Sequence, residues 1–137
     1  MKLKVLGIAL LVMLVAAGCV GQNEAVKTIE VDNGSYQEVN VDEFKTMMEN
    51  KDFVLVNVHI PFEGDLPQTD LSIPYNEIDQ HLGELPAEQD AKIFLYCRSG
   101  RMSAEAAEVL ANLGYTNVWH LAGGFNAWKA AGNPMAE

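Results

Sequence analysis

The chain has 137 residues, 49% of them hydrophobic, which is enough for one domain with a buried core and too few for two. Nine basic and nineteen acidic residues give a formal net charge of −10. Such a charge disfavours nucleic acid and anionic lipid head groups as partners. We therefore expect one acidic globular unit that does not bind nucleic acid.

The first residues have the pattern of a secretory signal peptide. Met1 to Lys4 is short and basic, and Val5 to Ala17 is an apolar run of 13 residues. A membrane-spanning helix needs roughly 20 apolar residues, so a permanent span is the weaker interpretation. We predict a signal peptide over residues 1–18 and export of the remainder.

A cysteine follows the apolar run directly. Ala16-Ala17-Gly18-Cys19 resembles the lipobox of bacterial lipoproteins, although Ala16 stands where that motif usually has Leu. The resemblance implies that Cys19 is lipidated and anchors the protein to the cell membrane, facing the periplasm or the exterior. The alternative is ordinary cleavage near Ala17 or Gly18, which leaves Cys19 as an incidental thiol.

The rest of the chain divides at about Tyr36. Residues 20–35 are polar and have no sustained apolar period, so we predict a flexible linker over 19–35 and a folded domain over 36–137. Without residues 1–18, seven basic and nineteen acidic residues remain, and the formal charge is −12.

Apolar runs of strand length alternate with helical patterns inside the domain. Strands are predicted at 53–58, 93–96 and 118–121, and helices from Asn40 to about 50, 76–82, 102–113 and 125–131. Residues 61–74 read as a long irregular connection. Because the strand runs lack alternation, we predict an α/β domain with a central parallel sheet covered by helices on both faces.

The segment with the clearest chemical signal is Cys97 to Ser103, between a predicted strand and a predicted helix. Parallel sheets place ligand sites at this edge, and a turn that leads into a helix presents backbone N–H groups and a positive dipole end. The only two arginines of the chain, Arg98 and Arg101, lie there. We therefore expect the Cys97 thiol to ionise more readily than a free cysteine, whose pKa is about 8.5. A buried structural cysteine is the alternative.

These residues resemble the active-site loop of the rhodanese family, whose pattern is Cys-Arg-x-Gly-x followed by Arg, Thr or Ser. Cys97, Arg98 and Gly100 match it, and Met102 departs at the sixth position. Residues 121–128 resemble the closing Gly-Gly-x-x-x-Trp element of the family, and the likeness extends over about 36–135. Asn57-Val58-His59 departs from the usual Asp-x-Arg, and no histidine follows Gly64.

The resemblance implies a rhodanese-like three-layer domain and a sulfurtransferase. In that family the cysteine thiolate takes the outer sulfur of a thiosulfate-like donor, becomes a persulfide and passes the sulfur to cyanide or a thiol. The resemblance makes Cys97 the nucleophile, and we expect the backbone N–H groups from Arg98 to Ser103 to surround the sulfur. The predicted substrate-binding set is Arg98, Ser99, Gly100, Arg101, Met102 and Ser103, with the two arginines attracting the anion and Met102 packing in the core. The partner is then a small sulfur-containing anion or thiol, and no cofactor is expected.

Three other functions are considered for this sequence. A phosphatase or arsenate reductase needs an arginine where this chain has Ser103. A redox exchanger would lack a resolving cysteine in the domain. A non-catalytic binding or sulfur-carrier module in the cell envelope is the main alternative, although Cys97 is present.

The histidines and tryptophans give weaker signals. His59, His81 and His120 have no metal-ligand spacing, and we expect each at the surface or partly buried, with no metal site. Trp128 is predicted in the core. The sequence does not decide whether Trp119 packs in the core or lines a substrate pocket.

Overall fold

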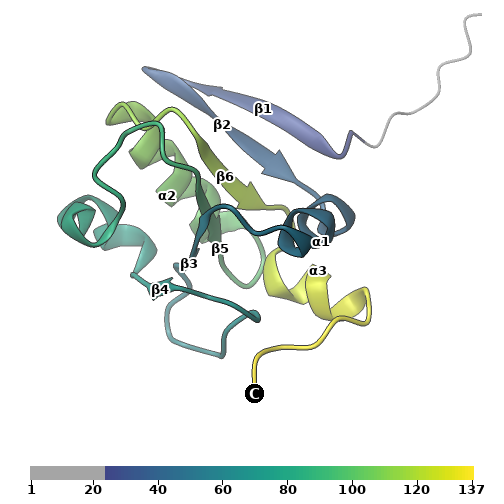
Figure 1. Ribbon diagram of the computed structural model, residues 1–137. Coiled ribbons are helices and arrows are strands. Elements are labelled where there is room, and N and C mark those ends of the chain that lie inside the picture. Colours follow the sequence, from purple (N-terminus) through teal and green to yellow (C-terminus); the bar gives the residue numbers. More distant parts are fainter. Residues whose placement is uncertain (1–23) are drawn as a thin grey trace, which may run out of the picture.

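The structure is a computed structural model that describes residues 24–137 (Figure 1). The predicted signal peptide over residues 1–18 and the predicted lipidation site Cys19 lie outside the described residues. None of the helices between residues 24 and 137 is long and apolar enough to cross a bilayer.

A six-stranded sheet forms the centre of the domain. Its strand order is β1-β2-β6-β5-β3-β4, and every neighbouring pair is parallel except β1 and β2, which form an antiparallel hairpin. The elements in chain order are β1 (Val26–Val31), β2 (Gly34–Val39), α1 (Val41–Glu49), β3 (Val54–Asn57), β4 (Leu71–Ser72), the 3-10 helices η1 (Tyr75–Gln80) and η2 (Leu82–Glu84), β5 (Ile93–Tyr96), α2 (Arg101–Asn112), β6 (Val118–Leu121) and α3 (Gly124–Ala130).

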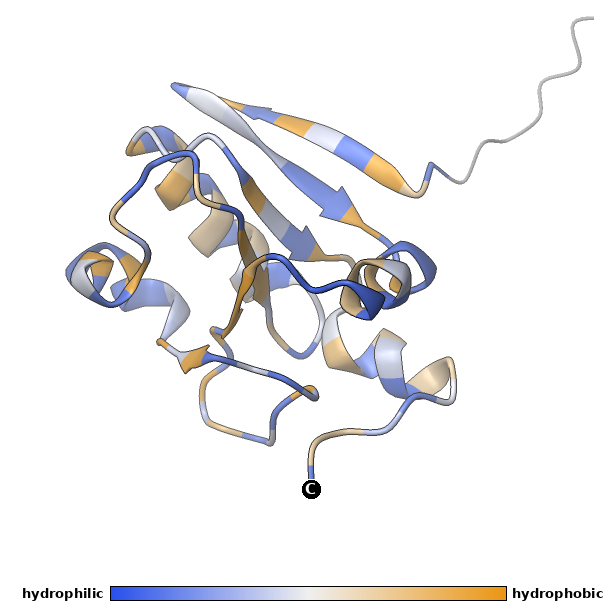
Figure 2. Ribbon diagram, viewed as in Figure 1, coloured by the Kyte–Doolittle hydropathy of each residue, from blue (hydrophilic) through white to orange (hydrophobic). Residues whose placement is uncertain are grey.

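Helices cover both faces of this sheet, so the domain has three layers (Figure 1). Strand β5 shows why: Ile93 and Leu95 pack on one face, and Phe94 and Tyr96 pack on the other, all buried. The first face meets α2 and η1, and the second meets α1 and α3. Hydrophobic residues concentrate in the central strands, whereas β2 is mostly hydrophilic (Figure 2). The predicted α/β fold with a central parallel sheet flanked by helices is confirmed, and the antiparallel strand β1 at the edge is an addition to it.

Several elements follow their sequence signals closely. Strands β5 and β6 have the predicted bounds, and α1 begins after Asn40, whose side chain accepts a hydrogen bond from the Glu43 N–H at 2.9 Å. Trp128 packs in the core as predicted, and Trp119 is half-buried against the same cluster. The helix predicted over 76–82 is replaced by the two short 3-10 helices η1 and η2.

The prediction of a flexible linker over residues 19–35 is wrong for its second half. Residues 26–31 form β1, which pairs with β2 along its whole length from Val26 opposite Val39 to Val31 opposite Gly34. Side chains of β1 are mostly exposed, so no apolar period marks the strand in the sequence. The folded domain therefore begins before Tyr36.

Candidate active site

Cys97 lies where β5 ends and the loop to α2 begins. Its side chain is buried and its thiol is free. Gly100 sits at the N-terminus of α2 with φ of 100°, and its N–H donates to the Cys97 Sγ at 3.0 Å. An L side chain rarely adopts this φ, which explains a glycine at this place in the loop. The backbone of the loop thus directs one donor, the Gly100 N–H, at the sulfur.

Gly123 and Gly124, at the start of α3, hold this loop against the last helix. The Phe125 N–H donates to the Cys97 carbonyl at 2.9 Å, and the Asn126 N–H donates to the Arg98 carbonyl at 3.0 Å. A Cβ on Gly124 would lie 2.2 Å from the Cys97 carbonyl oxygen. Only glycine permits this approach, so the Gly-Gly element fixes the carbonyl side of the loop and leaves its N–H side for the sulfur.

The two arginines point to solvent and contact carboxylates. Arg98 Nη1 lies 3.4 Å from Glu63 Oε1, and Arg101 Nη1 lies 2.9 Å from Glu105 Oε1. Both arginine side chains are more than half exposed. In this arrangement their charge is partly offset by neighbouring acids, and neither contacts the Cys97 sulfur.

The other loop residues differ in exposure. Ser99 is exposed, and Met102 is half-buried and packs against the core cluster under α2, as predicted. Ser103 is fully buried, with its Oγ 3.6 Å from Cys97 Sγ. Of the predicted substrate-binding side chains, Ser103 is therefore the one that approaches the sulfur.

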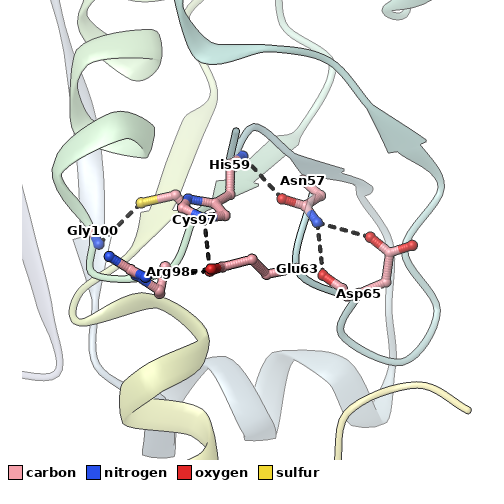
Figure 3. Close-up of polar contacts among 8 residues, drawn as sticks. Asn57, His59, Glu63, Asp65, Cys97, Arg98 and Gly100 are labelled. Carbon is pink, nitrogen blue, oxygen red and sulfur yellow. Dashed lines mark hydrogen bonds and ion pairs between the residues drawn. The ribbon is translucent and has the colours of Figure 1, made fainter. Parts of the chain in front are cut away.

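Beside the loop, the segment after β3 forms a polar network (Figure 3). The buried Asn57 amide donates to the Gly64 carbonyl at 3.0 Å and to Asp65 Oδ1 at 2.9 Å. His59 Nε2 lies 2.9 Å from Glu63 Oε2, and Glu63 also contacts Arg98. The segment with the departures from the family pattern is thus joined to the active-site loop through Glu63.

Two of the three histidines are more buried than predicted. His59 is 6% exposed and His120 is 1% exposed, whereas His81 is partly exposed as expected. His120 lies on the central strand β6, and His59 packs edge-on against the Phe125 ring. Among the described residues, His59 Nδ1 has no hydrogen-bond partner.

Sequence reasoning missed two residues behind the loop, His120 and Glu38, which connect to Ser103. Glu38 is 82 positions from His120, and the parallel pairing of β2 with β6 places them opposite each other. The place of His120 inside the apolar run of the predicted strand 118–121 is the one sequence signal that could have marked it. No cluster of three or more His, Cys, Asp or Glu side chains suited to a metal occurs within residues 24–137.

Comparison with known proteins finds a matching family and named relatives. Residues 40–131 match the rhodanese-like domain. A sulfurtransferase from Allochromatium vinosum is 34% identical over 92 residues, which are 65% of this chain and 83% of that protein. The thiosulfate sulfurtransferase GlpE from Vibrio cholerae is 29% identical over 73% of this chain and 94% of its own length.

A solved structure gives the same result for the fold. The crystal structure of a rhodanese-related protein from Thermoplasma volcanium superposes with a TM-score of 0.61 at 27% identity, over 72% of this chain and 96% of that one. The chain therefore belongs to the family of rhodanese-like domains and has sulfurtransferases among its relatives.

Proposed function

We propose that this protein is a sulfurtransferase that carries sulfane sulfur on Cys97, from a thiosulfate-like or persulfide donor to cyanide or a thiol. The observation that carries the proposal is the Gly100 N–H directed at the Sγ of a buried free thiol, at the N-terminus of α2. A donor in this position stabilises negative charge on sulfur. The named sulfurtransferases among its relatives support the same chemistry.

The proposed reaction has two steps, each a displacement at sulfur. The Cys97 thiolate attacks the outer sulfur of thiosulfate, the S–S bond of the donor breaks, and sulfite leaves with the bonding electron pair. The Cys97 persulfide anion remains, so the charges balance. A cyanide or thiolate acceptor then attacks the outer sulfur of the persulfide and regenerates the Cys97 thiolate.

The test is the intact mass of the full chain before and after incubation with thiosulfate. Every sample carries Cys19→Ser, so that Cys97 is the only thiol, and the matched control also carries Cys97→Ser. We expect a gain of one sulfur atom that disappears on addition of cyanide and is absent from the control. If neither thiosulfate nor an organic persulfide adds sulfur to Cys97, the catalytic proposal fails and a non-catalytic binding or carrier module is the better account.

We also propose that the enzyme works in the cell envelope. The support is the sequence of residues 1–19: a basic start, an apolar run and small residues before Cys19. In this proposal residues 1–18 are removed, and lipid on Cys19 holds the domain on the membrane, facing the periplasm or the exterior. Labelling with radioactive palmitate tests it: we expect label in the wild type and none in Cys19→Ser, and an unlabelled wild type would contradict lipidation.

A further inference from the structure

A chain of four side chains runs from the active-site thiol toward the edge of the sheet. Cys97 Sγ lies 3.6 Å from Ser103 Oγ, with the thiol as donor. Ser103 Oγ lies 2.9 Å from His120 Nδ1. His120 Nε2 lies 2.9 Å from Glu38 Oε2. The sulfur-transfer steps proposed above use only the first of these four side chains.

The fold brings these groups together from three separate elements. Glu38 on β2 and His120 on β6 are directly paired in the parallel ladder, and neighbouring strands lie side by side in Figure 1. Helix α2 packs on the same face of the sheet and contributes Ser103 from its first turn. The pairing of β2 with β6, and the packing of α2 on them, therefore place Ser103, His120 and Glu38 in this order.

The four side chains differ in burial: the Cys97 end of the series is enclosed, and the Glu38 end is partly exposed to solvent. Cys97 and Ser103 are buried, the His120 side chain is 2% exposed, and the Glu38 side chain is 30% exposed. A buried polar side chain is costly unless it has partners, and here each one has a partner on both sides. The chain thus connects the enclosed thiol with a carboxylate that reaches solvent.

The chemistry of the groups sets the direction of each hydrogen bond. A carboxylate only accepts, so the hydrogen between His120 and Glu38 is on Nε2. In the neutral ring Nδ1 is then an acceptor for the Ser103 hydroxyl, whose other possible acceptor is the Gly100 carbonyl at 3.2 Å. The Ser103 oxygen is left to accept from the Cys97 thiol. All three hydrogen bonds therefore donate in the same direction, from Cys97 toward Glu38.

The protonation of His120 in the resting protein fits this direction. Burial lowers the pKa of His120, against the opposing effect of the hydrogen bond and charge of Glu38. The ring is therefore neutral at neutral pH and its Nδ1 is available. Three other titratable groups lie on this side. Lys27 on β1 is directly opposite Glu38 in the antiparallel pair. Tyr36 on β2 packs edge-on against the His120 ring, and Glu108 on α2 lies near Tyr36. Burial and the charges of Glu38 and Glu108 raise the pKa of Tyr36, so its ring stays neutral.

We propose that Ser103, His120 and Glu38 form a proton relay that takes up the Cys97 proton when the nucleophile is generated. The inference rests on the proposed function, because it describes how the thiolate of the first step arises. The S–H proton passes to the Ser103 oxygen as the Ser103 proton passes to His120 Nδ1. Thiol and neutral imidazole become thiolate and imidazolium, with no proton gained or lost overall. Ser103 contacts the reacting sulfur, while His120 and Glu38 act through it as positioning residues.

Glu38→Gln is the first test, because the relay and a simple field effect predict opposite results. We measure the ultraviolet absorbance of the thiolate against pH in the full chain with Cys19→Ser, after subtracting the same chain with Cys97→Ser. The glutamine removes the charge that stabilises the imidazolium, so the relay predicts that the thiolate curve moves to higher pH by about one unit. Through space alone, loss of a nearby negative charge favours the thiolate and moves the curve to lower pH. Glu108→Gln, outside the chain of contacts, is the matched control and is expected to give no upward shift.

Two further variants test the inner members of the relay. His120→Asn keeps an acceptor for the Ser103 hydroxyl but cannot take a proton, and Ser103→Ala breaks the first contact. The relay predicts an upward shift in both, whereas a purely structural role of His120 predicts no shift in His120→Asn. An unchanged or lowered curve in Glu38→Gln overturns the relay.

The thiolate measurement also separates this inference from the proposed function, because it needs no sulfur donor. If the curve moves upward in Glu38→Gln but the wild type forms no persulfide, the proton relay stands and the sulfurtransferase proposal fails. If persulfide forms and the curve does not move, the relay alone fails.

Discussion

At the scale of single residues, Asn57 shows how a departure from the family pattern is accommodated. The family resemblance places an aspartate here, but this chain has an amide whose NH2 group donates to Gly64 and to the Asp65 carboxylate. Its carbonyl accepts from the His59 N–H at 3.0 Å. Asn57 is fully buried, whereas its partners Gly64 and Asp65 are partly exposed. An aspartate could accept from His59, but its carboxylate could not donate to Asp65.

We therefore predict that Asn57→Asp, the family residue, destabilises this protein. It would place a fully buried carboxylate within hydrogen-bonding distance of the partly buried Asp65 carboxylate, and we expect the free energy of unfolding in urea to fall by about 3 kcal/mol at neutral pH. Burial and Asp65 would raise the pKa of the new carboxyl, so the loss is largest at high pH and shrinks as acid protonates it.

A second substitution provides the control for that prediction. In Asn57→Asp with Asp65→Asn the two groups exchange roles, and an amide again faces a carboxylate. We expect the double variant to recover most of the lost stability, and equal stability of Asn57→Asp and the wild type at neutral pH would contradict the argument.

The residues of the site divide into those that sequence can predict and those that it cannot. Cys97 and Gly100 follow from the loop pattern, because their roles depend on local backbone geometry. Glu38 and His120 become neighbours only through strand pairing across 82 positions, and no local signal carries that information. The exposed arginines were expected to attract an anion, but contacts with Glu63 and Glu105 set their actual orientation.

At the scale of elements, the hairpin of β1 and β2 is where sequence patterns were weakest. β1 lies at the edge of the sheet with mostly exposed side chains, so tertiary pairing rather than hydrophobic period defines it. The two residues between the strands, Asp32 and Asn33, are of turn-forming types and were the available signal for this element. By contrast, β3, β5 and β6 are apolar because they are covered on both faces, and they were predictable for that reason.

Asn40 joins this hairpin to the first helix. Its N–H donates to the Ala25 carbonyl at 3.1 Å, and its side chain caps α1 through the Glu43 N–H. We predict that Asn40→Ala lowers the free energy of unfolding by about 1 kcal/mol, because the helix loses its side-chain cap while the backbone bond remains. Urea denaturation measures the change. Asn50→Ala, at the other end of α1, is the matched control and should have a smaller effect; equal effects of the two would argue against capping.

At the scale of the whole molecule, buried and partly buried ionisable groups connect stability to pH. Burial lowers the pKa of His120 in the core. Burial opposes ionisation of Asp70, but the hydrogen bond from the Leu55 N–H at 2.8 Å and the contact with Lys51 outweigh it and lower its pKa. In both cases the unfolded chain binds a proton more readily than the folded one, so acid favours unfolding.

The two groups act in different pH ranges. The pKa of a histidine in the unfolded chain is about 6.5. The stability that neutral His120 provides is therefore complete above that pH, and it is lost as the pH falls toward the lowered pKa of His120 in the folded protein. The contribution of Asp70 is present above about 3.9, the unfolded value, and is lost only at lower pH. Below about pH 6.5 and above the titration range of Asp70, His120 is therefore expected to control how the free energy of unfolding changes with pH.

We predict that the free energy of unfolding, measured by urea denaturation, falls between pH 7 and pH 5 with a slope of up to about 1.4 kcal/mol per pH unit for the single proton on His120. In His120→Asn the group that takes up the proton is gone, so the slope should be shallower even though the variant is less stable at pH 7. His81→Asn removes a histidine that is partly exposed and should keep the slope of the wild type. A wild type equally stable at pH 7 and pH 5, or a slope unchanged in His120→Asn, would show that the buried imidazole does not couple folding to protonation.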